Sequence, residues 1–315
     1  MRYFITGGAG FIGSSVCARL LAANSQDSVT VFDNLSSGKE SYIERHYVNP
    51  QFRFVKGDLL NSDELNSSIK GHDFVFHFAA NADIAKSMTN TDLDVKLTIV
   101  ATYNLLEAMR LGGVRKIVYS SGSGIYGDVG ITETAEDFGP LLPISLYGAS
   151  KLGAEGLISA FSHMFDMQAW IFRFANVIGG RQTHGVISDF IQKLKANSTT
   201  LDVLGNGTQS KAYIHVTDIM NAIFFVVERA KDRVNLFNVA TDDYITVREI
   251  AERVVAAMSL QGVKMNYSAS DRGWKGDVPV VRFNLDKIHT LGWRAKHSSQ
   301  QAVDRTIREL LEISG

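Results

Sequence analysis

The feature that most constrains this chain is a glycine-rich loop that follows its first strand-like run. Residues 3–6 form a short run typical of a strand, residues 7–13 read GGAGFIG, and a helical pattern of apolar residues covers 12–24. Glycine lets a backbone turn sharply and approach a phosphate closely, and the free amides at a helix start favour negative charge. In this strand–loop–helix context, Gly7, Gly10 and Gly13 predict a dinucleotide-binding site, which a glycine turn alone would not.

An acidic residue at the end of the next strand supports this interpretation. The strand-like run at 28–32 is followed by Asp33, twenty residues after Gly13. A carboxylate at this place accepts hydrogen bonds from the adenosine ribose and repels a 2′-phosphate, so it favours NAD over NADP. The alternative is that Asp33 only begins the polar turn at 33–38.

Short apolar runs alternate with longer stretches of helical period, as they do in a parallel sheet with crossover helices. We therefore expect an α/β fold, a Rossmann-type doubly wound parallel sheet. The predicted strands cover residues 3–6, 28–32, 52–56, 74–78, 116–120 and 169–174, and predicted helices include 12–24 and 95–111.

Beyond residue 174 the alternation gives way to glycine-rich and polar loops. A helix at 218–229, a strand at 236–240 and a helix at 247–258 follow them. We expect an NAD-binding domain at 1–175 with a return segment at about 211–240, and a smaller C-terminal substrate-binding lobe at 176–210 and 241–315.

The charge balance indicates a small-molecule partner. Lys and Arg total 32 and Asp and Glu total 33, which gives no electrostatic footprint for nucleic acid. The single cysteine, Cys17, lies in the apolar pattern of a helix, and we expect it in the core. No signal-like or membrane-spanning run is visible, so we expect a cytoplasmic protein that does not bind a membrane.

A tyrosine and a lysine four residues apart are candidate catalytic residues. The sequence YGASK places Tyr147 and Lys151 on one face of a helix, if a helix begins there. Free tyrosine has a pKa of about 10, but a nearby lysine charge favours the phenolate and would make it a base usable near neutrality. The pair alone means little, because surface helices carry such pairs by chance.

Together with other motifs, these residues resemble the extended short-chain dehydrogenase/reductases, the NAD-dependent epimerase/dehydratase family. Within this family the chain most resembles the UDP-glucose 4-epimerases and their relatives, over nearly its whole length. Besides GGAGFIG and YGASK, the motifs are DNLSSGK at 33–39, GDL at 57–59, HFAA at 77–80, RFANVIG at 173–179, AYIHVTD at 212–218 and GDVP at 276–279.

The resemblance implies roles for residues at matching positions. Tyr147 would be the base, Lys151 would bind the nicotinamide ribose and tune Tyr147, and Asn176 would face the substrate diphosphate. His77 and His215 lie in strand-like runs, and we expect them to be structural. The other cofactor contacts that it implies are Phe11, Ile12, Asp33, Asn34, Ser36, Ser37, Gly38, Asp58, Leu59, Phe78, Ala79, Ala80 and Ala175.

One departure from the family pattern concerns the hydroxyl that holds the sugar's 4-oxygen. Its usual position is Gly122 here, so Ser121 or Ser123 would supply it. Gly122 and Gly124 indicate that the segment has already left the strand and turns one serine inward. Ser121 is favoured because it lies nearer the strand end, and the alternative is that both serines only satisfy loop backbone groups.

Other departures affect phosphate and cofactor binding. Lys211 and Ala212 replace a usual arginine and aspartate, so a point charge replaces a bidentate phosphate grip. Trp274 replaces another arginine, which leaves Arg272 or Lys275 as the phosphate contact. Thr98 replaces an asparagine near the cofactor.

The resemblance also narrows the reaction. In these enzymes the tyrosine takes a proton from the sugar while C4 passes hydride to NAD. The acid and base that a 4,6-dehydratase then uses are Ser123 and Gly124 here. We therefore expect 4-epimerisation of a nucleotide sugar, most readily a UDP-sugar, with no metal.

Two alternatives remain open beside epimerisation. One is a 4,6-dehydratase or another NAD-dependent sugar-nucleotide enzyme, and the other is a regulatory protein that binds NAD without catalysis. The resemblance further implies a homodimer that pairs through the helix at 95–111 and the helix bearing YGASK.

Overall fold

The computed structural model describes residues 1–81 and 84–313. These divide into two compact units, and each is described by itself. The boundaries differ from the expected domains, because residues 123–145 and 211–226 fall in the second unit. The first unit comprises Met1–Gly122, Leu146–Arg173 and Val227–Phe237, and the second comprises Ser123–Ser145, Phe174–Val226 and the chain from Asn238 onward.

The first unit is built on a sheet that, within the described residues, has seven strands. The strands from β3 to β5 pair in parallel, and the sequence order reverses between β1 and β4. This reversal is the switch point of a doubly wound fold, beside which ligands bind. In spatial order the strands are β12 (Val234–Val239), β7 (Gln168–Phe174), β5 (Lys116–Gly122), β4 (Phe74–His77), β1 (Arg2–Thr6), β2 (Ser28–Asp33) and β3 (Phe52–Lys56).

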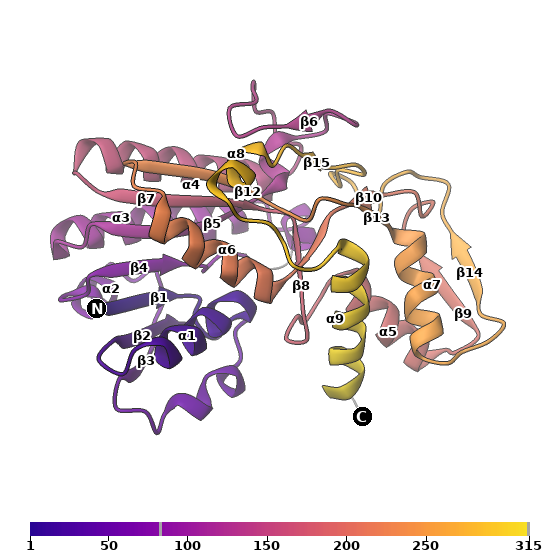
Figure 1. Ribbon diagram of the computed structural model, residues 1–315, viewed down its shortest axis with the longest axis horizontal. Helices are drawn as coiled ribbons and strands as arrows, with labels where there is room; N and C mark the ends of the chain where they lie inside the picture. Colours follow the sequence, from indigo (N-terminus) through magenta and orange to yellow (C-terminus); the bar gives the residue numbers. More distant parts are fainter. Residues whose placement is uncertain (82–83, 314–315) are drawn as a thin grey trace. The chain divides into compact units, whose positions relative to one another are not determined.

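Amphipathic helices cover this sheet (Figure 1). α1 (Phe11–Ala23) packs on β1 and β2, while α2 (Ser62–Ile69), α3 (Ala101–Gly112) and α4 (Leu146–Met164) lie side by side. Phe4 and Leu105 lie in the core between these helices and the sheet. Cys17 is fully buried, as predicted, and burial raises the pKa of its thiol to about 12.

Short helical turns precede α3. The helix expected at 95–111 has two parts, because the turn η4 (Val95–Val100) is π-helical before α3 begins. The 3₁₀ turns of the first unit are η1 (Glu40–Tyr42), η2 (Glu44–His46) and η3 (Ile84–Met88).

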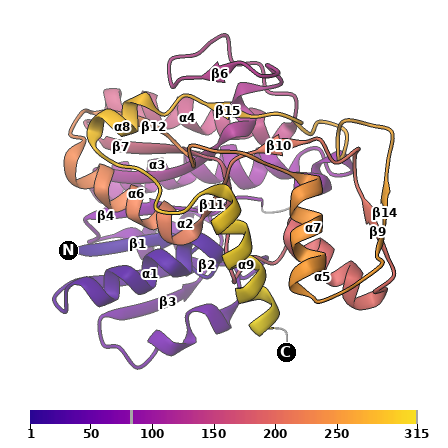
Figure 2. The ribbon, with the colours of Figure 1, turned by 45° about the vertical axis from the view of Figure 1, so that its right-hand side comes forward.

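The second unit combines a helical cluster with short strand pairs. α5 (Val186–Ala196), α7 (Val247–Ala257) and α9 (Ser299–Ile313) pack together (Figure 2). β9 (Thr200–Val203) and β14 (Lys264–Tyr267) pair in parallel. The other elements are η5 (Ser123–Tyr126), β6 (Glu133–Thr134), β8 (Asn176–Ile178), β10 (Ser210–Lys211), β11 (Tyr213–His215), α6 (Val216–Arg229), whose last residues belong to the first unit, β13 (Ile245–Thr246), β15 (Arg282–Phe283) and α8 (Asp286–Leu291).

The strands and most helices predicted from the sequence begin and end within two residues of the observed bounds. Of the expected return segment at about 211–240, β12 joins the sheet, where it lies beside β7. Within the described residues, none of the helices has the length and the apolar character that crossing a membrane requires.

Candidate active site

The glycine loop joins β1 to α1 and presents backbone amides. Gly7 has a left-handed backbone with φ of 66°, and a Cβ on Gly13 would lie 2.3 Å from the Gly7 carbonyl oxygen. Side chains are therefore excluded from both positions. Gly10 precedes α1 without a side-chain cap, so the first amides of the helix remain available to an anion. The loop has the donors that a pyrophosphate requires.

Asp33 links the end of β2 to this loop. Its carboxylate accepts hydrogen bonds from the amides of Ala9 at 2.9 Å and Leu35 at 2.8 Å. Burial raises its pKa above the ordinary value, and these two bonds oppose the rise. A Cβ on Gly38 would lie 3.0 Å from both carboxylate oxygens. Asp33 is thus more than a turn residue, because it holds the loop at which the cofactor is expected.

The segment after β4 runs beside the same loop. A Cβ on Gly7 would meet the Ala79 nitrogen at 2.6 Å, so the backbones are in close contact. Phe78 and Ala80, which flank Ala79, are only partly buried. The sequence-predicted cofactor residues of HFAA are thereby brought to the glycine loop.

The predicted adenosine-side residues form a connected group beyond β2 and β3. Asn34 donates its side-chain amide to the Asp58 carboxylate at 3.1 Å, and Leu59 beside it is buried. Ser36 and Ser37 are exposed in the turn after Asn34. Their contact with adenosine remains a prediction.

Tyr147 and Lys151 lie one turn apart at the start of α4. Tyr147 is partly buried, whereas Lys151 is 3% exposed. The Lys151 ammonium donates to the Ser120 carbonyl at 2.8 Å and lies 5.7 Å from the centre of the Tyr147 ring. It also lies 5.0 Å from the centre of the Tyr119 ring. Tyr147 and Lys151 therefore lie together, as expected, and the Lys151 ammonium lies at the carboxyl end of β5.

The protonation of this pair differs from the sequence expectation. Burial, followed by the Asp94 charge, raises the pKa of Tyr147 to about 12. Burial lowers the pKa of Lys151 to about 8, although Asp94 and Glu155 oppose the decrease. Burial therefore moves the pKa of Tyr147 away from neutrality, opposite to the decrease expected from a nearby lysine charge.

The serines that flank Gly122 have different surroundings. The expectation that the chain has left the strand here is wrong, since β5 continues to Gly122 and the 3₁₀ turn begins only at Ser123. Strand alternation places Ser121 on the same face as Tyr119, the residue over which Lys151 lies. Ser121 is buried, and its hydroxyl has no partner among the described residues.

A second buried hydroxyl without a partner in the described part of the chain is that of Thr98, on the π-helical turn η4. Such a group needs a hydrogen-bond partner. With the free amides of the glycine loop and the ammonium of Lys151, it fits a dinucleotide that carries hydroxyl, amide and phosphate groups.

The histidines expected to be structural are fully hydrogen-bonded. His77 contacts the hydroxyls of Thr6 at 2.7 Å and Thr102 at 3.0 Å, and burial lowers its pKa to about 3. His215 contacts Glu309 at 3.2 Å and a threonine hydroxyl at 2.8 Å. These contacts agree with the structural interpretation.

Sequence reasoning missed Asp94. Its carboxylate is completely buried beside η4 and accepts hydrogen bonds from Asn81 at 2.9 Å and from Ser87. The only sequence signal was an acidic residue just before an apolar helical pattern, which is also typical of an ordinary helix start.

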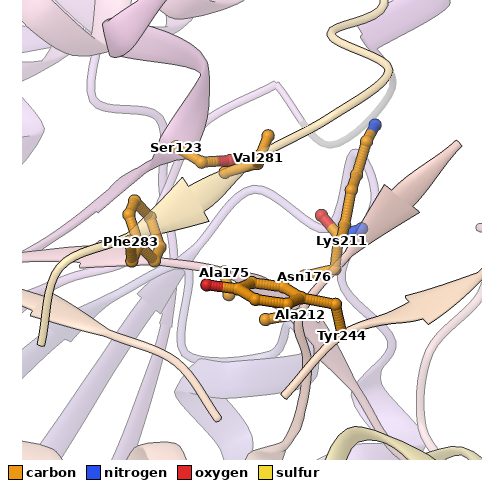
Figure 3. Close-up of a pocket in the computed structure, with 8 residues that line it drawn as sticks. All are labelled: Ser123, Ala175, Asn176, Lys211, Ala212, Tyr244, Val281 and Phe283. Carbon is orange, nitrogen blue, oxygen red and sulfur yellow. The ribbon is translucent and has the colours of Figure 1, made fainter. Parts of the chain in front are cut away.

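The second unit contains a pocket that gathers the predicted substrate residues. Asn176 and Lys211 line it together with Ser123 and Tyr244 (Figure 3). Ala175, predicted at the cofactor, is part of the same wall. Its other lining residues are Ala212, Val281 and Phe283.

The two predicted phosphate-binding cations already have anionic partners. Lys211 contacts the Asp277 carboxylate at 2.7 Å. Arg272 donates to the Asp277 carbonyl at 2.6 Å and pairs with the Asp128 carboxylate. A diphosphate would therefore share or displace these carboxylates.

Comparison with known proteins identifies the chain's family. The sequence profile of the NAD dependent epimerase/dehydratase family matches residues 3–240. The chain belongs to this family. Members of the NAD dependent epimerase/dehydratase family use NAD, and NAD is therefore the cofactor of this chain.

The UDP-glucose 4-epimerase of Mycolicibacterium smegmatis is 34% identical over 315 residues, which cover 98% of this chain and 97% of that protein. The crystal structure of a UDP-galactose 4-epimerase superposes with a TM-score of 0.88 at 34% identity, over 99% of both chains. A dTDP-glucose 4,6-dehydratase from Streptomyces venezuelae, with NAD bound, superposes with a TM-score of 0.90 at 26% identity, over 99% of this chain and 97% of that one. Proteins with this fold thus include both epimerases and dehydratases. The fold alone does not fix the reaction, which depends on the side chains of the active site.

Proposed function

We propose that this protein is an NAD-dependent nucleotide-sugar 4-epimerase whose substrate is a UDP-sugar. The observation that carries the proposal is the Tyr147–Lys151 pair on α4, in a chain that resembles UDP-sugar 4-epimerases over its whole length. A regulatory NAD-binding protein would use Lys151 only to hold the nicotinamide ribose and would have no need of a tyrosine beside it as a base.

The residues of the first unit supply the proton transfer. Tyr147 accepts the proton of the sugar's 4-hydroxyl, and Lys151 holds the nicotinamide ribose and stabilises the phenolate. When bound, NAD would supply the acceptor and later the donor of the C4 hydride, and the positive charge of its oxidised ring would favour the Tyr147 phenolate. Tyr147 would return the proton to the 4-oxygen once the sugar is reduced on its other face.

The residues after β5 favour epimerisation over dehydration. Elimination of water across C5 and C6 needs an acid and a base near the 4-keto sugar. The matching positions are Ser123 and Gly124, and neither side chain titrates near neutrality. The dehydratase alternative is supported by likeness to proteins that are named as 4,6-dehydratases, among them the dTDP-glucose 4,6-dehydratase.

The second unit would bind the nucleotide diphosphate. Asn176 and Lys211 line its pocket, and Tyr244 and Phe283 provide aromatic surface for a sugar or base. Lys211 would contact a phosphate after sharing its charge with Asp277, and Arg272 would do so after sharing with Asp128.

We further propose that the enzyme is a cytoplasmic homodimer. The outward faces of η4 and α3 carry exposed apolar side chains, namely Val95, Val100, Tyr103 and Leu111. Such a row is typical of a surface that packs against another helix.

The reaction is tested by incubating the protein and NAD with UDP-glucose, dTDP-glucose or GDP-mannose and following the sugar protons by NMR. We expect UDP-glucose to equilibrate with UDP-galactose.

Tyr147→Phe removes the base, so turnover should fall by roughly 100- to 10,000-fold while NAD binding is nearly retained.

Two results would contradict the proposal. A 4-keto-6-deoxy product would identify a dehydratase. Retention of NAD with no change in any of the three sugar nucleotides, by a protein that also binds them, would support the regulatory alternative.

A further inference from the structure

Arg282, at the start of β15, is held in place by neutral oxygen atoms. Its guanidinium donates to the carbonyl oxygens of Ser210 and Val281, each at 2.9 Å, and to the Ser210 hydroxyl at 3.0 Å. Among the residues that the structure describes, no carboxylate lies within ion-pairing distance of it. Arginine offers a planar fork of donors, and three hydrogen bonds from this fork fix the position of the group.

The same guanidinium lies over the ring of Tyr244. Its central carbon is 3.9 Å from the centre of the ring, a distance that is possible only over the face of the ring. A cation over an aromatic face is attracted by the electrons of the ring. The contact occupies one face of Tyr244 and leaves the other face and the edge to its surroundings.

This contact links two segments that contribute to the pocket of the second unit. Ser210 precedes Lys211 in β10, which pairs antiparallel with β13, and Tyr244 immediately precedes β13. Arg282 therefore ties the strand that carries Lys211 to the ring that precedes the neighbouring strand. All of these residues belong to the second unit, so the arrangement does not depend on the first.

Tyr244 is the part of this arrangement that a ligand would meet. Its ring lines one side of the pocket, and Ser123 and Val281 line the other (Figure 3). Val281 and Phe283 both line the pocket. Because side chains alternate along an extended chain, Arg282 between them projects to the other side. The guanidinium thus supports the Tyr244 ring from outside the pocket.

The other lining residues indicate which part of a nucleotide sugar this pocket takes. Asn176 and Lys211 are the residues expected at the diphosphate. Ser123 directly follows Gly122, the position at which the 4-oxygen of the sugar is expected. The hexose ring is the part of the substrate that joins the diphosphate to the reacting carbon. Its carbon-bound hydrogens form an apolar face that packs well on an aromatic ring.

We propose that Arg282 is a positioning residue that holds the Tyr244 ring as the wall against which the hexose of the substrate packs. Arg282 acts through Tyr244 and does not touch the sugar. The assignment to the hexose rests on the proposed function, whereas the support of the ring by Arg282 is a property of the folded chain alone.

The first test uses the protein without sugar nucleotide, labelled with 3-fluorotyrosine, in which Tyr244→Phe identifies the ¹⁹F NMR signal of Tyr244. Arg282→Lys keeps the positive charge but loses the planar fork, so it cannot hold Ser210 and cover the ring at once. We expect the Tyr244 signal to move towards that of an exposed tyrosine. A signal that stays in place would overturn the proposal.

The second unit offers a matched control for this change. Arg248 lies over the ring of Tyr267, with its guanidinium carbon 4.4 Å from the ring centre, and the pair lies outside the lining of the pocket. Arg248→Lys should leave both the Tyr244 signal and the affinity for UDP-glucose unchanged. If it weakens binding as much as Arg282→Lys does, the effect is a general loss of stability and the proposal fails.

The second test is titration calorimetry of the NAD-loaded protein with UDP-glucose and with UDP. Arg282→Lys and Tyr244→Leu should each weaken the binding of UDP-glucose by roughly three- to tenfold, the scale of one aromatic contact. Tyr244→Phe keeps the ring and should bind UDP-glucose as the unaltered protein does. UDP lacks the hexose, so its affinity should stay near that of the unaltered protein in all three variants. An equal loss for UDP would refute the assignment to the hexose.

A double variant separates positioning from direct contact. If Arg282 acts through Tyr244, Arg282→Lys combined with Tyr244→Leu weakens binding no more than Tyr244→Leu alone. Additive losses would show that Arg282 contacts the ligand itself, and they would refute the positioning role. Failure of the unaltered protein to bind UDP-glucose would refute the hexose wall together with the proposed substrate. A protein that gives every expected binding result but does not epimerise would contradict the proposed function and leave this inference intact.

Discussion

Ser121 is the hydroxyl that we expect to hold the sugar's 4-oxygen. It is buried at the end of β5 in the same unit as Tyr147, and its oxygen has no partner within the described residues. Ser121→Ala should therefore lower kcat tenfold or more, the scale of a lost hydrogen bond to a developing oxyanion. Ser123→Ala should stay near the unaltered activity.

Steady-state kinetics of the two variants on the same UDP-sugar check this prediction. The opposite order would transfer the role to Ser123. If neither substitution changes kcat, the two serines only satisfy neighbouring groups, and Tyr147 alone contacts the 4-oxygen.

Single residues also show where sequence reasoning ends. The spacing of Tyr147 and Lys151 was sufficient to predict their proximity, because a helix turn fixes it. Their pKa values were not predictable, since these depend on burial and on Asp94, more than fifty residues away in sequence. Lys211 and Asn176, each predicted to bind the substrate phosphates, line one pocket, but the pairing of Lys211 with Asp277 has no signature in the sequence.

At the scale of elements, the carboxyl end of β2 and the glycine loop act together through Asp33. Its two bonds to backbone amides mean that Asp33→Gly should lower the melting temperature as well as the affinity for NAD, because buried donors lose their acceptor. We expect the unaltered protein to bind NAD more tightly than NADP.

Titration calorimetry with both cofactors measures this preference. In Asp33→Gly combined with Ser37→Arg, the preference should narrow or reverse, because the carboxylate is gone and a guanidinium faces the 2′-phosphate. Asp33→Gly alone is the control for the loss of loop support. Equal affinities of the unaltered protein for the two cofactors would refute the role of Asp33 in selectivity.

Elements with a strong local pattern were predictable, and those set by distant partners were not. The strands of the central sheet are apolar runs bounded by polar turns, and this pattern predicts them directly. By contrast, β6 exists because Thr134 pairs with Phe283 of β15. The π-helical turn η4 shares its apolar pattern with the α-helix that follows, so their boundary was invisible.

At the scale of the whole molecule, the prediction to test is dimerisation. Tyr103 is 48% exposed on α3 beside the exposed Val100. Tyr103→Lys should weaken the dimer at least tenfold, because an ammonium would be buried in an apolar contact. Light scattering at micromolar concentration measures the mass.

Val48→Lys is the matched control, because Val48 is 91% exposed and lies outside these helices. It should remain dimeric. A monomeric mass for the unaltered protein would contradict the dimer, and a dimer unaffected by Tyr103→Lys would place the contact elsewhere.

The division of the chain into two units has an evolutionary consequence. The backbone passes from one unit to the other after Gly122, Ser145, Arg173, Val226 and Phe237, so neither unit is a continuous stretch of gene. Recombination cannot exchange the pocket-bearing unit as a cassette while leaving the sheet intact. We therefore expect sugar preference to change through substitutions at single lining positions of the second unit's pocket, such as Tyr244 and Val281, and ancestral reconstruction would test this expectation.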